Sequence, residues 1–430
     1  MWSVLGLTGP FGSGCSTLAR VLEKEFSFRV TRLSDYIKAV AVRAQVLDGS
    51  KVGMSQEAVD GIIGEIAGIV KELGKEFNPK QFEDCGCDDV RRTLQNVGNK
   101  GRKVYGRGFW ARLCWERVRR EARDGNVPVV IDGIRNVGEV EALRGFTRRF
   151  YLVAVTAGYE ERWERVKDEF GGNQQKFDEI EQRDREETDN AGLPVAHGQQ
   201  VEACVDMADV VIRNPNVEEA SIDTALRKKI EQYIEPLLDP GIRGPFEDEF
   251  FMTMAYVAST RSECLKRRVG ACIVADKTDS VFVGWNHAPD EECVRKYRQC
   301  YRDYLKKKVK KCPVCGRDIF ECQDKGHRAF IRLLDRCRAI HAEQSALLQA
   351  TKSGVSVSGG VLYCTTMPCL TCAKLLIEAG IKRVIYVEPY PDKDSFKLLR
   401  DTFGAENVVE FEGIKAPAFM QVFRRAVREG

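Results

Sequence analysis

Short apolar runs alternate with longer amphipathic segments through the first half of the chain. The apolar runs Val4–Thr8, 127–132 and Phe150–Thr156 predict buried strands, and segments 16–25 and 137–144 predict helices. Because strands that alternate with helices usually join into a parallel sheet, this half predicts a parallel α/β domain.

The second half shows the same alternation after a Pro- and Gly-bearing stretch. Helices are expected at 251–266, 340–353 and 369–379, and strands at 269–275, Val281–Trp285, 360–365 and 384–387, the first two strands being paired. Asp239-Pro240-Gly241 and Gly244-Pro245 place the junction near 238–246. We therefore predict domains at 1–238 and 246–430, with a cysteine-bearing polar insertion at about 287–336 in the second.

Composition and charge limit the classes of protein that fit. The chain is 43% hydrophobic and carries a net charge of only +3, so no global field drives it onto nucleic acid or an acidic membrane. No apolar stretch approaches the roughly 18 residues that span a bilayer. The first residues read as a strand that enters a glycine loop and not as a secretory signal. A cytoplasmic protein is the expectation.

Two short motifs in the second half carry metal chemistry. His341-Ala342-Glu343 opens a predicted helix, and Pro368-Cys369-Leu370-Thr371-Cys372 opens the next one. Zinc nucleobase deaminases carry the signature H-x-E followed by P-C-x-x-C. Three protein ligands leave one coordination position of zinc for water. The zinc ion lowers the pKa of that water towards about 7. We predict zinc ligands at His341, Cys369 and Cys372, with Glu343 as the catalytic proton shuttle.

The structural alternative is that His341 and Glu343 form a solvated helix start. Cys369 and Cys372 would then be a packed pair without metal. Either half of the signature alone favours that interpretation. Both halves together, in the order helix–strand–helix, favour zinc. A purely structural zinc centre in a non-enzymatic sensor is weakened by Glu343, which has no role in a closed coordination shell.

The segments around these motifs resemble the deoxycytidylate deaminase family. Residues 338–343 (RAIHAE), 362–369 (LYCTTMPC), 267–274 (RRVGACIV) and 284–286 (GWN) carry the resemblance, which covers about 250–425. It implies a cytidine-deaminase-like α/β/α sandwich and a homo-oligomer. It also implies that Asn286 hydrogen-bonds the sugar 3′-hydroxyl and that the Ala342 N–H meets the cytosine carbonyl. Ser345 stands where the family often has asparagine.

The insertion carries a further metal signal. Cys312-Pro313-Val314-Cys315 resembles a zinc knuckle, and two more ligands are required. Cys293 and Cys300 form the preferred pair, with Cys322 and His327 as the alternatives. Four ligands close the coordination shell, so this zinc would be structural. The competing interpretation is a set of reduced surface cysteines.

A glycine-rich loop near the N-terminus has the context of a phosphate-binding loop. It runs from Gly9 through Gly12 and Gly14 to Cys15, Ser16 and Thr17, between a predicted strand and a predicted helix. Cys15 occupies the position of the usual lysine, so phosphoryl transfer loses its main cation. We predict nucleotide binding without kinase activity, with Ser16 reaching Mg²⁺; a mere tight turn is the alternative.

The rest of this half resembles deoxynucleoside monophosphate kinases and dephospho-coenzyme A kinases over residues 1–215. Segment 129–136 (VVIDGIRN) is similar to a motif whose Asp and Arg approach nucleotide and metal, and 208–214 (ADVVIRN) is similar to the last strand. The resemblance implies a P-loop kinase-like parallel sheet for the first domain.

Together the two halves are similar to bacterial anti-phage dCTP deaminases. That resemblance implies deamination of dCTP or dCMP to the deoxyuridine nucleotide, gated by a nucleotide or phage signal at the first domain. Two enzymatic alternatives remain. The near-neutral charge weighs against a polynucleotide or tRNA deaminase, and Cys15 weighs against a nucleotide kinase.

Overall fold

The structure is a computed structural model. It describes residues 3–87, 89–121, 127–185, 187, 195–214, 219–308, 311–312, 314–317, 337–388 and 393–423. Within this part of the chain, no helix combines the length and apolar character needed to cross a bilayer.

The chain forms two compact units, one of them discontinuous in sequence. Unit 1 contains residues 1–244 and 412–430, and unit 2 contains residues 245–411. The first boundary lies in the predicted junction, but residues 412–430 belong to unit 1 and not to the predicted second domain. The reason is pairing: Gly413 and Ile414 form a short strand beside Val211 and Val210.

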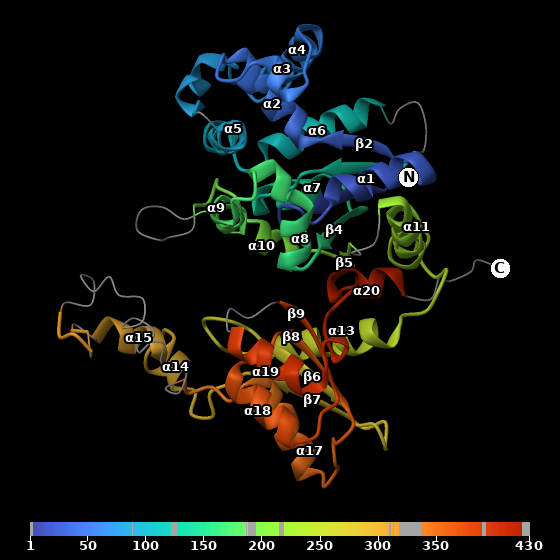
Figure 1. Ribbon diagram of the computed structural model, residues 1–430, viewed down its shortest axis with the longest axis vertical. Coiled ribbons are helices and arrows are strands. Elements are labelled where there is room, and N and C mark those ends of the chain that lie inside the picture. The colour runs from blue at the N-terminus through green and yellow to red at the C-terminus, as the bar shows by residue number, and fades with distance from the viewer. Residues whose placement is uncertain are drawn as a thin grey trace. The chain divides into compact units, whose positions relative to one another are not determined.

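Unit 1 is an α/β sandwich with a long helical segment between its second and third strands (Figure 1). Its strands are β1 (Val4–Thr8), β2 (Arg29–Arg32), β3 (Val129–Asp132), β4 (Phe150–Thr156), β5 (Val210–Arg213) and β11 (Gly413–Ile414). Its helices are α1 (Cys15–Phe26), α2 (Leu33–Arg43), α3 (Gly49–Val52), α4 (Gln56–Glu72), η1 (Pro79–Cys85), α5 (Val90–Tyr105), α6 (Phe109–Glu121), α7 (Val137–Phe146), α8 (Tyr159–Val166), η3 (Lys167–Phe170), α9 (Gln174–Arg185), α10 (Val201–Asp206), α11 (Glu219–Lys229), η4 (Ile230–Ile234), α12 (Glu235–Leu238) and α20 (Ala416–Val422).

The sheet of unit 1 has the order β11-β5-β4-β1-β3-β2. All neighbours are parallel except β11, which runs antiparallel to β5. The predicted strands and the parallel sheet are therefore confirmed. Side chains alternate between two cores. Leu5 and Leu7 of β1 pack with α1, α11 and α20, whereas Val4 packs with α2, α4, α5 and α6.

Unit 2 has the same three-layer plan on a smaller scale. Its strands are β6 (Gly270–Val274), β7 (Val281–Trp285), β8 (Val361–Thr366), β9 (Arg383–Glu388) and β10 (Val408–Glu410). Its described helices are α13 (Glu247–Ser259), α14 (Glu292–Arg295), α15 (Tyr301–Lys308), α17 (Ala342–Lys352), α18 (Leu370–Glu378), α19 (Lys393–Phe403) and η6 (Ala405–Asn407).

The sheet of unit 2 has the order β10-β9-β8-β6-β7, in which β6 is antiparallel to both of its neighbours. The predicted pairing of the first two strands is confirmed. One core joins the sheet to α17, α18 and α19, and the other joins it to α13. The predicted α/β/α layering of this half agrees with that arrangement (Figure 1).

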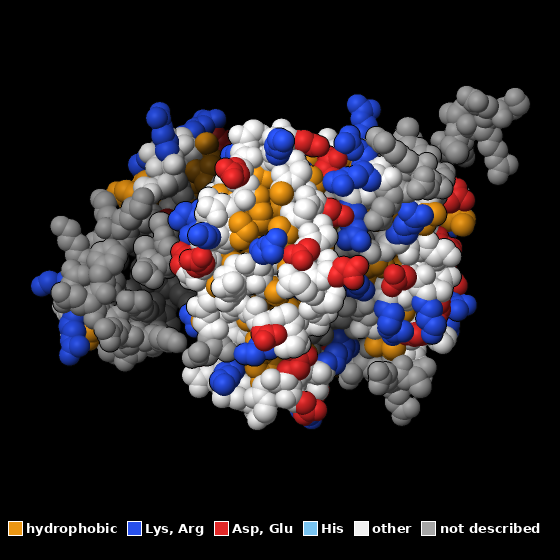
Figure 2. Space-filling view, turned by 90° about the horizontal axis from the view of Figure 1, so that it is seen from above, with side chains coloured by type: hydrophobic (Ala, Val, Ile, Leu, Met, Phe, Trp, Pro, Cys, Tyr) orange, Lys and Arg blue, Asp and Glu red, His pale blue; other side chains and the backbone are white. Residues whose placement is uncertain are grey.

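Basic and acidic side chains are interspersed on the face of the molecule shown in Figure 2. The net charge of +3 is consistent with such a mixture. That face therefore presents no extended surface of one charge sign.

Gly284 of β7 sets how closely α17 approaches the sheet. A Cβ at this position would lie 2.3 Å from the Ala342 carbonyl oxygen and 2.4 Å from the Ala346 nitrogen. Both atoms are backbone, so they cannot move aside as a flexible side chain can. A glycine here lets the first turn of α17 lie directly on β7.

We expect Gly284→Ala to destabilise the protein by about 1–3 kcal/mol, because it overpacks a backbone contact. Gly61→Ala in α4 is the control, since a Cβ there has no atom within 4 Å and alanine favours a helix interior. Denaturant unfolding of both variants checks this. Equal stability of the two variants would contradict the role of Gly284.

Candidate active site

Two helix N-termini bring the motif residues together. His341 is the N-cap of α17, and its backbone N–H donates to Oε1 of Gln344 at 2.9 Å. Cys369 is the N-cap of α18, which places Cys372 in the first turn of that helix. The positive end of each helix dipole favours thiolate and carboxylate groups at these positions.

The three predicted zinc ligands converge. Nδ1 of His341 lies 3.4 Å from Sγ of Cys369 and 3.4 Å from Sγ of Cys372. All three donor atoms lie within 4.8 Å of one another. Tetrahedral zinc with ordinary Zn–S and Zn–N lengths separates such donors by about 3.5 Å. The donor set and its spacing therefore fit a zinc ion.

Hydrogen bonds between the three predicted ligands and their neighbours shift the pKa values of these ligands. The hydrogen bond with Cys372 lowers the pKa of the Cys369 thiol to about 4, and the same bond raises the pKa of Cys372. Hydrogen bonds with Cys337 and Cys369 raise the pKa of His341 to about 10. The cluster thus favours negative charge on a thiol next to an imidazole.

Glu343 lies beside this cluster at the second position of α17 and is only 4% exposed. Burial raises the pKa of its carboxyl, and the neighbouring His341 opposes that rise. A raised carboxyl pKa favours proton uptake by Glu343, which a proton shuttle requires.

A cavity of about 260 Å³ opens onto these groups. Its lining includes the predicted substrate residues Asn286 and Ala342 together with His341, Glu343 and Cys369. Ala342 is the first residue of α17, where backbone N–H groups have no partner inside the helix. That N–H is the donor that the family resemblance assigns to the cytosine carbonyl.

Asn286 is held firmly at the wall of this cavity. Its Oδ1 accepts from Oγ of Ser262 at 2.6 Å and from the Val269 N–H at 2.8 Å. Its Nδ2 donates to the Arg267 carbonyl at 2.8 Å. The amide nitrogen carries a second hydrogen, which no described residue accepts. That hydrogen is the one that remains for a sugar hydroxyl.

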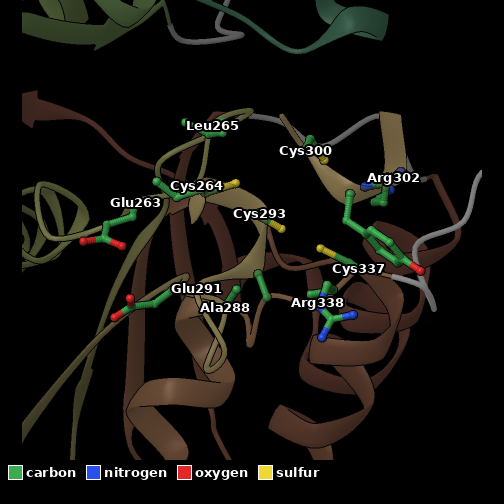
Figure 3. Close-up of a pocket in the computed structure, with 13 residues that line it drawn as sticks. Glu263, Cys264, Leu265, Ala288, Glu291, Cys293, Cys300, Arg302, Cys337 and Arg338 are labelled. Carbon is green, nitrogen blue, oxygen red and sulfur yellow. The ribbon is translucent and has the colours of Figure 1, made fainter. Parts of the chain in front are cut away.

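A second, smaller cavity lies next to the first and is lined by four cysteines. The sulfur atoms of Cys264, Cys293, Cys300 and Cys337 face a common space (Figure 3). The cavity measures about 30 Å³, which is the share of one water molecule. Burial raises the pKa of the Cys293 thiol, and the Cys300, Cys337 and Cys264 sulfurs raise it further. We call these four residues the cysteine cluster.

This cluster differs from the predicted ligand set. Cys293 and Cys300 belong to both, but Cys312 and Cys315 do not line the cavity. They lie in a tight turn in which the Gly316 N–H donates to the Cys312 carbonyl at 2.9 Å. The alternatives Cys322 and His327 lie outside the described residues. Sequence reasoning missed Cys264 and Cys337, because neither belongs to a C-x2-C pair.

Cys337 connects the cysteine cluster to the motif residues. It hydrogen-bonds His341, and this contact lowers the pKa of the Cys337 thiol. Because residues 337–340 lead directly into the N-cap of α17, the cysteine cluster and the predicted ligand His341 share one backbone segment.

The predicted phosphate loop of unit 1 is a glycine-rich turn. It follows β1 and ends at α1, with Gly12 and Gly14 at φ of 78° and 96°, where a side chain would be strained. Oγ of Ser16 donates to Oδ2 of Asp132 at 2.9 Å. Both residues lie at the carboxyl edge of the parallel strands, the usual place for a ligand in such a sheet.

Cys15 is partly buried where a phosphate loop usually has lysine. Burial, followed by the charge of Asp132, raises the pKa of its thiol to about 12, and the Arg135 guanidinium opposes the rise. Arg135 is fixed by Asp184, with Nη1 and Oδ2 2.6 Å apart. A cation from the segment after β3 therefore stands near the loop although the lysine is absent.

Comparison with known proteins identifies the family of the second unit. A family described as "Cytidine and deoxycytidylate deaminase zinc-binding region" matches residues 246–388. Deoxycytidylate deaminase of Saccharomyces cerevisiae is 33% identical over 172 residues, covering 40% of this chain and 46% of that protein. The chain thus spans about half the length of this relative.

Two phage proteins are covered almost completely. Deoxycytidylate deaminase of Mycobacterium phage D29 is 31% identical over 142 residues, with 33% of this chain and 94% of that protein covered. The crystal structure of cyanophage S-TIM5 dCMP deaminase in complex with dCMP and dUMP matches at 27% identity. That match covers 39% of this chain and 98% of the other, with a TM-score of 0.26. By these sequence matches, the chain belongs to the deoxycytidylate deaminase family.

Proposed function

We propose that unit 2 hydrolytically deaminates a free deoxycytidine nucleotide, dCMP or dCTP, to the deoxyuridine nucleotide. The observation that carries the proposal is the convergence of His341, Cys369 and Cys372 beside the buried carboxyl of Glu343. A cavity large enough for a pyrimidine ring opens onto them. Membership of the family supports the choice of a mononucleotide over a polynucleotide.

Each residue has a defined task in this reaction. His341, Cys369 and Cys372 would hold zinc, which, when bound, supplies Lewis acidity for the attacking water. The Glu343 carboxylate takes a proton from that water as its oxygen adds to C4 of cytosine. Glu343 passes that proton to the ring nitrogen, then takes the remaining proton from the oxygen now on C4 and delivers it to the leaving amine. The C4 carbonyl forms as the C4–N4 bond breaks and ammonia departs. Asn286 and the Ala342 N–H hold the sugar and the base carbonyl in place.

We further propose that the cysteine cluster binds a structural zinc. The four cysteines line one common space, and four thiolate ligands would leave zinc without an open position. Four neighbouring thiols also ionise together only if a cation compensates their charge. This set, Cys264, Cys293, Cys300 and Cys337, is an alternative to the one predicted from the C-x2-C spacing and shares Cys293 and Cys300 with it.

For unit 1 we propose a P-loop kinase-like domain that binds a regulatory nucleotide. Support comes from the central position of β1 and from the loop that follows it. Ser16 and Asp132 would reach Mg²⁺, and Arg135 would supply positive charge in place of the lysine. The domain would sense a nucleotide or phage signal in the cytoplasm and gate dCTP depletion in a homo-oligomer.

Glu343→Gln should lower kcat by about 10²–10⁴-fold, because it removes the proton shuttle. Zinc content should stay unchanged, since Glu343 is not a ligand. The assay incubates purified protein with dCMP and with dCTP and resolves the products. Glu378→Gln, at an exposed position of α18, serves as the control. Uracil products from neither substrate with the unaltered protein would refute the proposed function.

Zinc analysis tests the cysteine cluster. Cys264→Ser should lower bound zinc by one equivalent per chain while the catalytic equivalent remains. Cys315→Ser is the comparison, because Cys315 belongs only to the set predicted from sequence. Loss of one equivalent with Cys315→Ser and none with Cys264→Ser would return the site to that earlier set.

Calorimetric titration with Mg-ATP and with each deoxynucleoside triphosphate tests unit 1. Arg135→Gln should weaken binding of the regulatory nucleotide by about tenfold, the effect of one charge-assisted contact. Basal deamination should remain, but its response to that nucleotide should be lost. Arg185→Gln, at the end of α9 and paired only distantly with Glu202 at 3.8 Å, is the control. Unaltered binding by the Arg135 variant would contradict the assignment.

A further inference from the structure

Arg302 stands between the two cavities of unit 2. It is the second residue of α15, and it lines both the cavity that opens onto His341 and the one formed by the cysteine cluster. Figure 3 shows it on the same segment as Cys300. The insertion, which the deaminase motif does not use, therefore contributes a cation to the wall of the catalytic cavity.

Three basic side chains line that cavity, and their partners differ. Nζ of Lys266 lies 2.7 Å from Oδ1 of Asp303, and Nη2 of Arg267 lies 2.5 Å from Oε2 of Glu388. Each of these cations already has a carboxylate partner. Nε of Arg302 is buried without a hydrogen-bond partner among the described residues. A buried, unpaired guanidinium donor is costly unless an anion meets it.

The segment that carries Arg302 is held in place by several contacts. Tyr301 stacks near Tyr297, with ring centroids 4.9 Å apart, and the Arg338 guanidinium lies 5.3 Å from the Tyr301 ring. Lys266 ties the next residue, Asp303, to the wall of the cavity. Cys300 of the cysteine cluster immediately precedes α15. The position of Arg302 is thus set before a ligand arrives.

We propose that Arg302 binds the 5′-phosphate group of the substrate. The proposal deepens the proposed function and rests on it. A guanidinium offers paired donors that match phosphate oxygens, and partial burial strengthens such a contact. The base enters towards His341 and Glu343, and the phosphate end meets the insertion. In this arrangement the cysteine cluster positions Arg302 through Cys300.

The test compares kcat and KM of the holoenzyme and of Arg302→Gln with dCMP and with dCTP. We expect KM for the preferred nucleotide to rise about 10- to 100-fold, the effect of losing one charge-assisted phosphate contact. We expect kcat to change less than about threefold, because the contact is equal in ground and transition states. Arg302→Lys, which keeps the charge, should recover part of the loss. Arg298→Gln, at an exposed position of the same insertion, should behave like the unaltered protein.

Three outcomes overturn the inference. These are an unchanged KM, an equal fall of kcat for all substrates, and a lysine variant no better than the glutamine variant. Zinc content measured in parallel shows whether a variant has lost its metal, and Arg302→Lys remains informative if Arg302→Gln does not fold. An unaltered protein that deaminates neither nucleotide would instead refute the proposed function itself.

Discussion

The close packing of α17 on β7 is the contact on which the candidate site depends. Gly284 lets two backbones touch where any side chain would separate them. The first turn of α17 carries His341, Ala342 and Glu343, so its distance from the sheet fixes a metal ligand, a backbone donor and a carboxyl at once. The N-terminus of α18 reaches the same point from β8, which places Cys369 and Cys372 opposite. The geometry of the site is therefore a property of helix–sheet packing.

Much of this arrangement was predictable because its signals are local. The apolar runs of β1, β4 and β7 have the predicted bounds, and the motif residues lie on the first turns of two helices. The cysteine cluster was only half predicted. Cys264 follows α13 and Cys337 precedes α17, and nothing in their spacing indicates that the fold brings them beside Cys293. A C-x2-C pair is conspicuous in a sequence, but the sheet decides which cysteines meet.

In unit 1, likewise, local sequence does not reveal which charged side chain lies near the glycine loop. Cys15 stands where a phosphate loop usually has its lysine, and position 15 is a partly buried thiol with a raised pKa. Arg135 follows the end of β3, far along the chain, and its approach to the loop follows from the parallel pairing of β1 with β3. The short strand β11 was missed because two residues carry no periodicity. Its pairing with β5 makes it part of the sheet.

The return of the chain to unit 1 at β11 has a consequence for synthesis. The ribosome completes all of unit 2 before residues 413–414 emerge, so the sheet of unit 1 still lacks its edge strand when the candidate site can already form. Until then β5 has an open edge of unpaired backbone groups, which favours association with other strands. The Lys415 ammonium, which directly follows β11, donates hydrogen bonds to the Val205 and Asp206 carbonyls and so holds this segment on unit 1. A chain that stops before residue 412 would keep every residue of the candidate site and leave that edge exposed.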